Sequence, residues 1–335
     1  MRRLAASAGA AALGTILALV PPGPASATPT PVPTPDECAW AGASALERGC
    51  PVEDSGPVMP LPPLAESDRG GNGEDEGCWT DGDFVFFESC TFGSPTATHS
   101  VALVGNSHAA QYLTPLRAWA QRYDFRLVTF LIPKCFATTA PIVFDKPGMT
   151  ERCLAWGKWV QEQVESLDPD LIVTSERTYK RPLHSSPDGD AAVWQRGYER
   201  YLEAWADRSV LVVRDSPVPR EPVPECLQNN PTRYSVCAGE RSRWLPPDPL
   251  VEAAKTFPAF RVADLSRYMC TDTQCPGVIG GMLVYRDGSH LSATWIRAFG
   301  GFLEPDFAAA LADATVRPSD LDRDLHGQRP RIAGQ

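Results

Sequence analysis

The chain has 335 residues, of which 43% are hydrophobic and 21% charged, and its formal net charge is −10 at pH 7. A chain of this length can bury the core of one full globular domain and still carry extensions. An acidic sequence without a run of basic residues disfavours nucleic acid and anionic membrane surfaces as partners.

The first 27 residues have the pattern of a secretory signal peptide. Arg2 and Arg3 precede an Ala-rich apolar run, Leu4–Val20, and residues 25–27 (Ala-Ser-Ala) have the small-x-small form at which such leaders are cut. The run is short for a membrane span, which needs about 20 apolar residues. A cleaved signal peptide and a secreted or cell-surface protein are therefore favoured over an uncleaved membrane anchor.

The ten cysteines are even in number and follow an export signal, which favours disulfides over a metal site. No Cys-x-x-Cys pair or histidine cluster supports a bound metal, and none is expected. Sequence does not fix the connectivity, and the simplest expectation pairs neighbours along the chain. The expected pairs are Cys38–Cys50, Cys78–Cys90, Cys135–Cys153, Cys226–Cys237 and Cys270–Cys275.

Composition divides the chain into four parts. Residues 51–77 are rich in proline, glycine and acidic side chains and show no core-forming pattern, which predicts a flexible linker. Cys38 and Cys50 bracket a small segment within the linker region. The expected parts are a signal peptide at 1–27, a linker at 28–77, a globular domain at 78–315 and a disordered tail at 316–335.

From residue 101 onward, short apolar runs alternate with helical patterns. Strands are predicted at 101–104, 126–132, 171–174, 210–213 and 260–264, an edge strand at 84–87, and helices at 109–123, 151–167, 190–207, 248–256 and 292–311. Such alternation predicts right-handed crossovers and a parallel sheet covered on both faces. The expected fold is a three-layer α/β/α, flavodoxin-like sheet of five parallel strands in the order 2-1-3-4-5. The first strand then ends at the switch point, where ligands bind.

The first strand runs into Gly105-Asn106-Ser107-His108, and a helical pattern follows at once. A turn of this kind lifts one side chain to the carboxyl edge of the sheet, beside a helix N-terminus whose N–H groups can stabilise an oxyanion. Here that side chain is Ser107, whose alternative role is to cap the helix. Asn106 is expected to shape the turn and His108 to pack structurally.

A second block, Asp287-Gly288-Ser289-His290, supplies what a nucleophilic serine needs. Asp287 lies three residues before His290, so its carboxylate can reach the imidazole Nδ1 within one loop. The hypothesis makes Ser107 the nucleophile, His290 the general base and Asp287 the residue that orients the base. The alternatives are an ordinary surface histidine and the aspartate of an Asp-Gly turn.

Together the two blocks resemble the SGNH hydrolase superfamily, and most closely the SGNH domain at the C-terminus of membrane acyltransferases that O-acetylate cell-surface glycans. The resemblance covers residues 78–311. It implies a serine-dependent esterase or O-acyltransferase that acts on acyl esters, with acetyl expected, of cell-wall or exported polysaccharide through an acyl-serine intermediate. It implies no cofactor, an acylated glycan or acyl donor as partner, and a separate membrane acyltransferase as a further candidate. Residues 4–20 then have a third interpretation, the end of a longer acyltransferase's last membrane helix.

The oxyanion hole departs from the superfamily pattern, which adds a glycine after the second strand and an asparagine after the third. Neither occurs at residues 132–135 or 175–178. The Ser107 backbone N–H is the expected first donor, and Ser175 or Arg177 the expected second. The departure keeps a second hypothesis open, namely a catalytically inactive SGNH-fold protein that binds carbohydrate or serves as a scaffold.

Three tryptophans, Trp40, Trp79 and Trp244, could stack on sugar rings. Nothing in the sequence places them at the site, so packing is the favoured role for all three.

Overall fold

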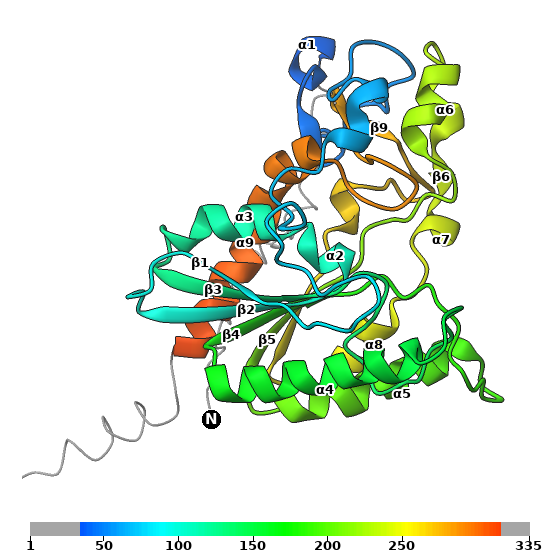
Figure 1. Ribbon diagram of the computed structural model, residues 1–335. Helices are drawn as coiled ribbons and strands as arrows, with labels where there is room; N and C mark the ends of the chain where they lie inside the picture. Colours follow the sequence, from blue (N-terminus) through cyan, green and yellow to red (C-terminus); the bar gives the residue numbers. More distant parts are fainter. Residues whose placement is uncertain (1–33, 316–335) are drawn as a thin grey trace, which may run out of the picture. The chain divides into compact units, whose positions relative to one another are not determined.

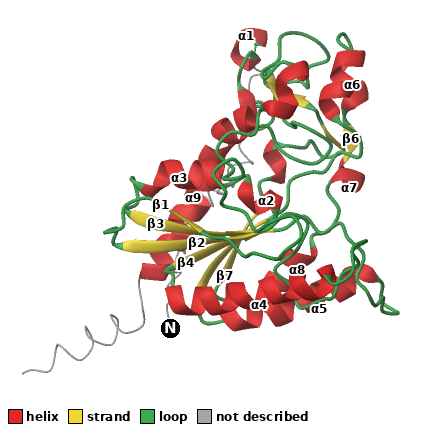
Figure 2. Cartoon of the chain, in the orientation of Figure 1, coloured by secondary structure: helices red, strands yellow, loops and turns green. Residues whose placement is uncertain are grey.

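The computed structural model describes residues 34–315, so the predicted signal peptide at 1–27 and the predicted tail at 316–335 lie outside the described residues. A six-stranded sheet forms the centre, in the order β1-β3-β2-β4-β5-β7 (Figures 1 and 2). Its strands are β1 (Cys90–Phe92), β2 (His99–Gly105), β3 (Phe125–Leu131), β4 (Leu171–Ser175), β5 (Ser209–Val213) and β7 (Phe260–Ala263). The last five are parallel and follow the predicted order, and β1 adds an antiparallel edge strand beside β3.

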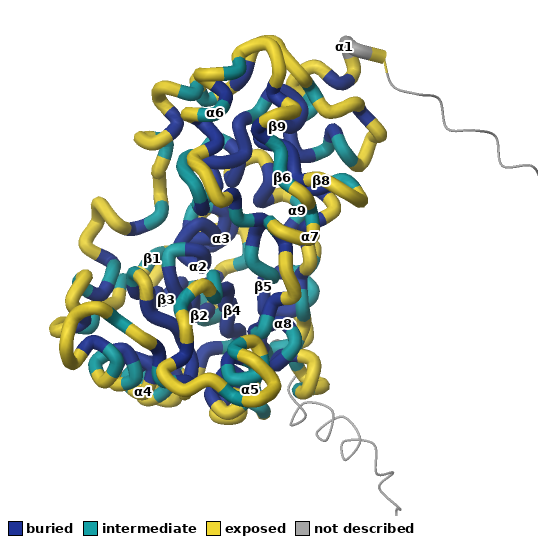
Figure 3. The backbone as a smooth tube through the Cα atoms, turned by 90° about the vertical axis from the view of Figure 1, so that its right-hand side faces the viewer, coloured by how far each residue is buried: buried dark blue, intermediate teal, exposed yellow. Residues whose placement is uncertain are grey.

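Helices cover both faces of the sheet, as predicted for a three-layer α/β/α fold (Figure 1). On one face lie α3 (Leu113–Ala120) and α9 (Ala293–Thr315), and on the other α4 (Met149–Leu167), α5 (Asp190–Leu202) and α8 (Pro249–Ala254). Alternate residues of β2 therefore belong to different cores: Leu103 packs in the first and Val104 in the second. Figure 3 shows the central strands as a buried block, which explains their continuous apolar sequences.

The edge strand predicted at residues 84–87 is wrong, and the strand forms a few residues later, where Cys90 lies opposite Thr129. The Asp81 carboxylate accepts the backbone N–H groups of Val85 and Phe86, each at 2.7 Å, and so closes a turn. These N–H groups are therefore not available to a sheet ladder.

The predicted helix at 109–123 is two helices, α2 (Ser107–Ala110) and α3. Pro115 lacks the backbone N–H that would continue the hydrogen-bond ladder through this point. Between residues 214 and 247, where no helix or strand was predicted, the chain forms α6 (Val223–Asn229) and α7 (Arg241–Trp244). Apart from short 3-10 turns, the remaining described elements are α1 (Pro35–Cys38), β6 (Gly239–Glu240), β8 (Gln274–Cys275), β9 (Val278–Ile279) and β10 (Met282–Leu283).

Residues 51–77 are packed on the domain, in contrast to the flexible linker predicted for them. Val58 and Ala65 are buried in the first core. The Met59 carbonyl accepts the Leu283 N–H at 2.8 Å, and the Asp68 carboxylate accepts the Thr294 N–H at the start of α9, also at 2.8 Å. The partners lie more than 200 residues away along the chain, so local composition does not reveal them.

The ten cysteines form the five disulfides expected from sequential pairing. Within residues 34–315, no group of three His, Cys, Asp or Glu side chains is arranged to hold a metal ion. None of the described helices combines the length and apolarity that a membrane crossing requires.

Candidate active site

Strand β2 ends at Gly105, where the chain must turn without a side chain. The residue has φ +142°, and a Cβ there would lie 2.5 Å from the Ser175 carbonyl oxygen of neighbouring β4. Asn106 follows and caps helix α2, because its Oδ1 accepts the His108 N–H at 3.0 Å. The capping role that sequence left open for Ser107 thus belongs to Asn106, and the Ser107 hydroxyl is left for another partner.

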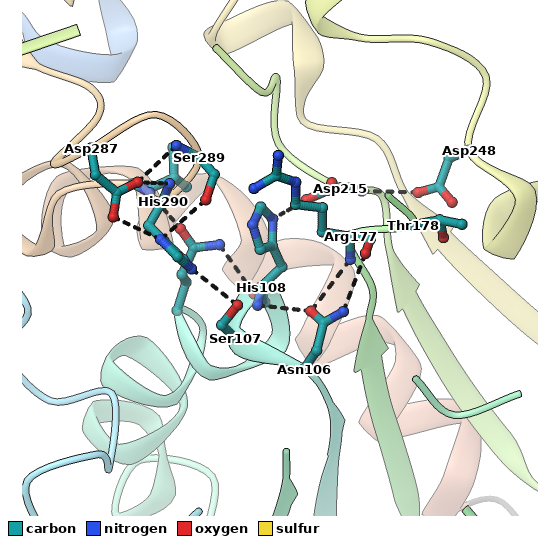
Figure 4. Close-up of polar contacts among 12 residues, drawn as sticks. Asn106, Ser107, His108, Arg177, Thr178, Asp215, Asp248, Asp287, Ser289 and His290 are labelled. Atoms are coloured by element: carbon teal, nitrogen blue, oxygen red, sulfur yellow. Dashed lines mark hydrogen bonds and ion pairs between the residues drawn. The ribbon is translucent and has the colours of Figure 1, made fainter. Parts of the chain in front are cut away.

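That partner is His290. The Ser107 Oγ lies 3.0 Å from Nε2 of His290, and Nδ1 of the same ring lies 2.8 Å from the Asp287 Oδ2 (Figure 4). The serine and the histidine are 183 residues apart along the chain. The fold therefore brings together the three residues that the sequence hypothesis selects, in the order hydroxyl, imidazole, carboxylate.

The loop before α9 curls around the Asp287 carboxylate. Its Oδ1 accepts the backbone N–H groups of Ser289 and His290, each at 2.7 Å, and the Arg286 guanidinium lies 3.2 Å from Oδ2. These contacts occupy both carboxylate oxygens and fix the loop. The imidazole is consequently held in one orientation by groups adjacent to it in sequence.

The electrostatics of the pair suit a base. Burial raises the pKa of the Asp287 carboxyl, but the hydrogen bond and charge of His290, the loop N–H and Arg286 outweigh it and hold that pKa well below its usual range. Burial lowers the pKa of His290, and the nearby His108 acts in the same direction, against the raising effect of Asp287. At neutral pH, Asp287 is therefore ionised and His290 neutral. Its partners assign the tautomer: Nδ1–H donates to Asp287, and Nε2 accepts the Ser107 O–H.

The three residues predicted to supply oxyanion-hole donors differ in their hydrogen-bond partners and in their positions relative to the Ser107 pocket. No acceptor for the Ser107 backbone N–H is found among the described residues. The Arg177 N–H donates to Asn106 Oδ1 at 3.3 Å, and Ser175 is buried at the end of β4. Neither of the latter two lines the small pocket that contains Ser107 and His290. The role of Ser175 and Arg177 as donors stays a prediction.

A second histidine–aspartate pair lies behind the first and was not identified from sequence. His108 is 1% exposed, and its Nδ1 is hydrogen-bonded to Asp215. The Asp215 N–H donates to Asp248 Oδ2 at 3.0 Å, and the His108 ring centroid lies 5.2 Å from that of His290. Asp215 comes two residues after the end of β5. A position just after a predicted strand, at the carboxyl edge of the sheet, is the sequence feature that could have marked Asp215 as a site residue.

A family model described as "SGNH domain (fused to AT3 domains)" matches residues 75–305, more than half of the chain. The chain belongs to this family. The AT3-type SGNH assignment fits the two sequence blocks, because Ser107, Asp287 and His290 all lie within the matched residues.

Two solved structures are similar to this SGNH domain. One is the periplasmic domain of a lipopolysaccharide acetyltransferase from Salmonella ser. Paratyphi A, with 11% identity over 75% of this chain and 98% of that one, and a TM-score of 0.50. The other is a carbohydrate esterase family 2 enzyme with a carbohydrate-binding domain from Corynascus thermopiles, with 13% identity over 65% and 68%, and a TM-score of 0.38. At 11% identity, the likeness to the first structure concerns the fold alone. No curated protein matches the chain.

Proposed function

We propose that this SGNH domain is a serine-dependent esterase or O-acyltransferase that acts on acyl esters, with acetyl as the favoured group, of cell-wall or exported polysaccharide. The single observation that carries the proposal is the continuous hydrogen-bonded series from Ser107 through His290 to Asp287. A half-buried neutral imidazole between a hydroxyl and an ionised carboxylate is the arrangement that activates a serine.

In the proposed reaction, Ser107 Oγ attacks the acyl carbonyl carbon as its proton passes to His290 Nε2. The tetrahedral intermediate collapses, the leaving alcohol takes that proton, and an acyl-serine remains. An incoming hydroxyl then attacks the acyl carbon and gives its proton to His290, and collapse returns the proton to Ser107. Asp287 stays ionised throughout and stabilises the imidazolium.

The acceptor decides between the two activities. Water gives an esterase, and a sugar hydroxyl gives a transferase. The signal-peptide pattern and the five disulfides support a site outside the cytoplasm. An exported transferase needs acyl groups delivered across the membrane, so a separate membrane acyltransferase is the proposed partner in that case.

A fluorophosphonate probe tests the nucleophile directly. We expect it to label the wild-type protein covalently and to leave the Ser107→Ala variant unlabelled. The exposed Ser94 provides a matched control, because it lies outside both sequence blocks and does not line the pocket that contains Ser107 and His290. Labelling of Ser107→Ala, or no labelling of folded wild-type protein, would contradict the proposal. The second result would favour the inactive carbohydrate-binding or scaffold protein.

A second assay separates hydrolysis from transfer. The acyl-enzyme formed from an activated acetyl ester is divided between water and an added oligosaccharide. Acetate alone as the product identifies an esterase. Acetylated oligosaccharide that increases with acceptor concentration identifies a transferase.

A further inference from the structure

A cleft of about 500 Å³ lies beside the proposed catalytic loop, and Gly288 of that loop lines it. Four arginines also line it: Arg177 after β4, Arg214 after β5, Arg220 before α6 and Arg243 in α7. They come from separate parts of the sequence, so the chain contains no basic run that reveals them. The fold thus builds a basic cleft on a protein whose net charge is −10.

Three of these arginines have no anionic partner within residues 34–315. Arg214 is bonded to a neighbouring carboxylate. For Arg177, Arg220 and Arg243, the described part of the chain provides neither an ion pair nor a side-chain hydrogen bond. The Arg177 guanidinium lies over the Tyr179 ring, 4.9 Å from its centroid, a contact that leaves its N–H groups free to bind a ligand.

Three acidic side chains line the cleft against its four arginines, and all three are engaged within the protein. Glu176 is 0% exposed, and burial raises the pKa of its carboxyl well above the usual range, which favours the uncharged form. Asp215 is bonded to His108. Asp248 accepts backbone N–H groups on both carboxylate oxygens, at 2.9 and 3.0 Å.

Three residues that line the cleft carry buried polar atoms without a partner among the described residues. Glu176 Oε2, Ser216 Oγ and Arg214 Nε are all buried and have no hydrogen-bond partner among residues 34–315. Unsatisfied buried groups of this kind are rare and destabilising, and a bound ligand can satisfy them. Sugar hydroxyls offer both donors and acceptors to such groups. Tyr179 and Trp244 add aromatic rings to the lining of the cleft.

We propose that this cleft binds an anionic saccharide, that is, a glycan with carboxylate or phosphate groups, next to the Ser107 acyl group. Arg177, Arg220 and Arg243 pair with the anionic groups, since guanidinium matches the geometry of both carboxylate and phosphate. The inference rests on the proposed function and adds to it the class of polysaccharide. A cleft of this size lies within the range of natural ligand sites, about 300–1,000 Å³.

The test is a calorimetric titration of the full chain with three ligands. They are a galacturonate oligosaccharide, the same oligosaccharide with its carboxyls reduced to alcohols, and a glycerol phosphate oligomer. We expect at least one charged ligand to bind at least about tenfold more tightly than the reduced one, with the difference shrinking as salt is added. The tighter of the two identifies carboxylate or phosphate as the natural group. Equal affinity for all three would overturn the inference.

Matched variants locate the site. Arg220→Gln/Arg243→Gln removes two exposed arginines of the cleft, and Arg48→Gln/Arg196→Gln removes two exposed arginines elsewhere. Because both pairs change the net charge equally, a general charge effect would weaken both alike. We expect the cleft pair to lose at least about tenfold in affinity for the charged ligand and the control pair less than twofold. Equal losses, or no loss in the cleft pair, would overturn the inference.

Fluorophosphonate labelling of the same preparations keeps the two proposals distinguishable. If the protein is labelled but binds the reduced ligand as tightly as the charged ones, the proposed catalysis stands and the proposed anionic cleft is contradicted. If the protein is not labelled but binds a charged ligand through the cleft arginines, the cleft stands as a binding site and the proposed catalysis is contradicted.

Discussion

Asp287 and His290 lie three residues apart, and the carboxylate accepts both the imidazole N–H and two loop N–H groups. In Asp287→Asn, the amide offers an N–H toward Nδ1 and so favours the wrong tautomer. We expect kcat to fall by about 10²–10⁴-fold on an activated acetyl ester, with little change in the unfolding midpoint. A loss smaller than about tenfold would contradict the assigned role of Asp287.

The lowered pKa of His290 predicts the pH dependence of activity. The base must be neutral to accept the Ser107 proton, so kcat/KM rises as pH rises through the pKa of His290 in the free enzyme. Since burial shifts this pKa downward, the midpoint of that rise is expected below the ordinary imidazole value of 6.5. A rate profile from pH 4 to 8 measures it. A midpoint at or above 6.5 would contradict the burial argument.

Ser107, Asp287 and His290 could be predicted from sequence because each lies in a short motif whose chemistry is local. The pairing of His108 with Asp215 could not be predicted in the same way. The two residues follow strands β2 and β5, which are not neighbours in the sheet. The three unpaired arginines were missed for a related reason, since only the folded chain brings them to one cleft.

At the level of elements, the β2–α2 turn depends on Gly105. In Gly105→Ala, the new Cβ meets the Ser175 carbonyl at 2.5 Å and the Ala109 Cβ at 2.8 Å, at a φ that side chains rarely adopt. We expect a loss of about 1–3 kcal/mol in the free energy of unfolding and a loss of activity as Ser107 moves with the turn. Urea unfolding and ester hydrolysis measure the two effects.

Gly301→Ala is the control for this substitution. Gly301 is exposed in α9, and no atom lies within 4 Å of its added Cβ. Because alanine is a better helix former, the control variant should gain about 0.5–1 kcal/mol in stability. Equal changes in unfolding free energy and in activity for the two variants would contradict the role assigned to the backbone geometry of Gly105.

The five parallel strands were predictable because strands buried on both faces have continuous apolar sequences. The edge strand was not, because an apolar segment such as residues 84–87 can also form a turn with Phe84 buried in the core. The side-chain hydrogen bonds of Asp81 decide between the two. Residues 51–77 similarly owe their order to partners near the C-terminal helix, which composition does not report.

At the level of the whole molecule, the five disulfides all join residues 5 to 18 positions apart. The disulfide with the largest sequence separation, Cys135–Cys153, connects the segment after β3 to helix α4. Replacing both cysteines with alanine should lower the free energy of unfolding by about 2–4 kcal/mol, because the unfolded chain gains freedom. Urea denaturation of the oxidised proteins measures the difference. A double variant as stable as wild type would show that this bridge is dispensable.

Because each disulfide joins residues close together along the chain, the disulfides do not connect the proposed catalytic residues to one another. No disulfide links the segment around Ser107 to the segment around His290, so noncovalent contacts hold the two segments together. Besides the Ser107–His290 hydrogen bond, the Leu291 N–H donates to the Gln111 side chain, and helix α3 packs against α9. Separation of these two helices would break the Ser107–His290 hydrogen bond while every cross-link survived. A fully oxidised preparation can therefore be inactive, and thiol titration is no substitute for an activity assay in judging refolded material.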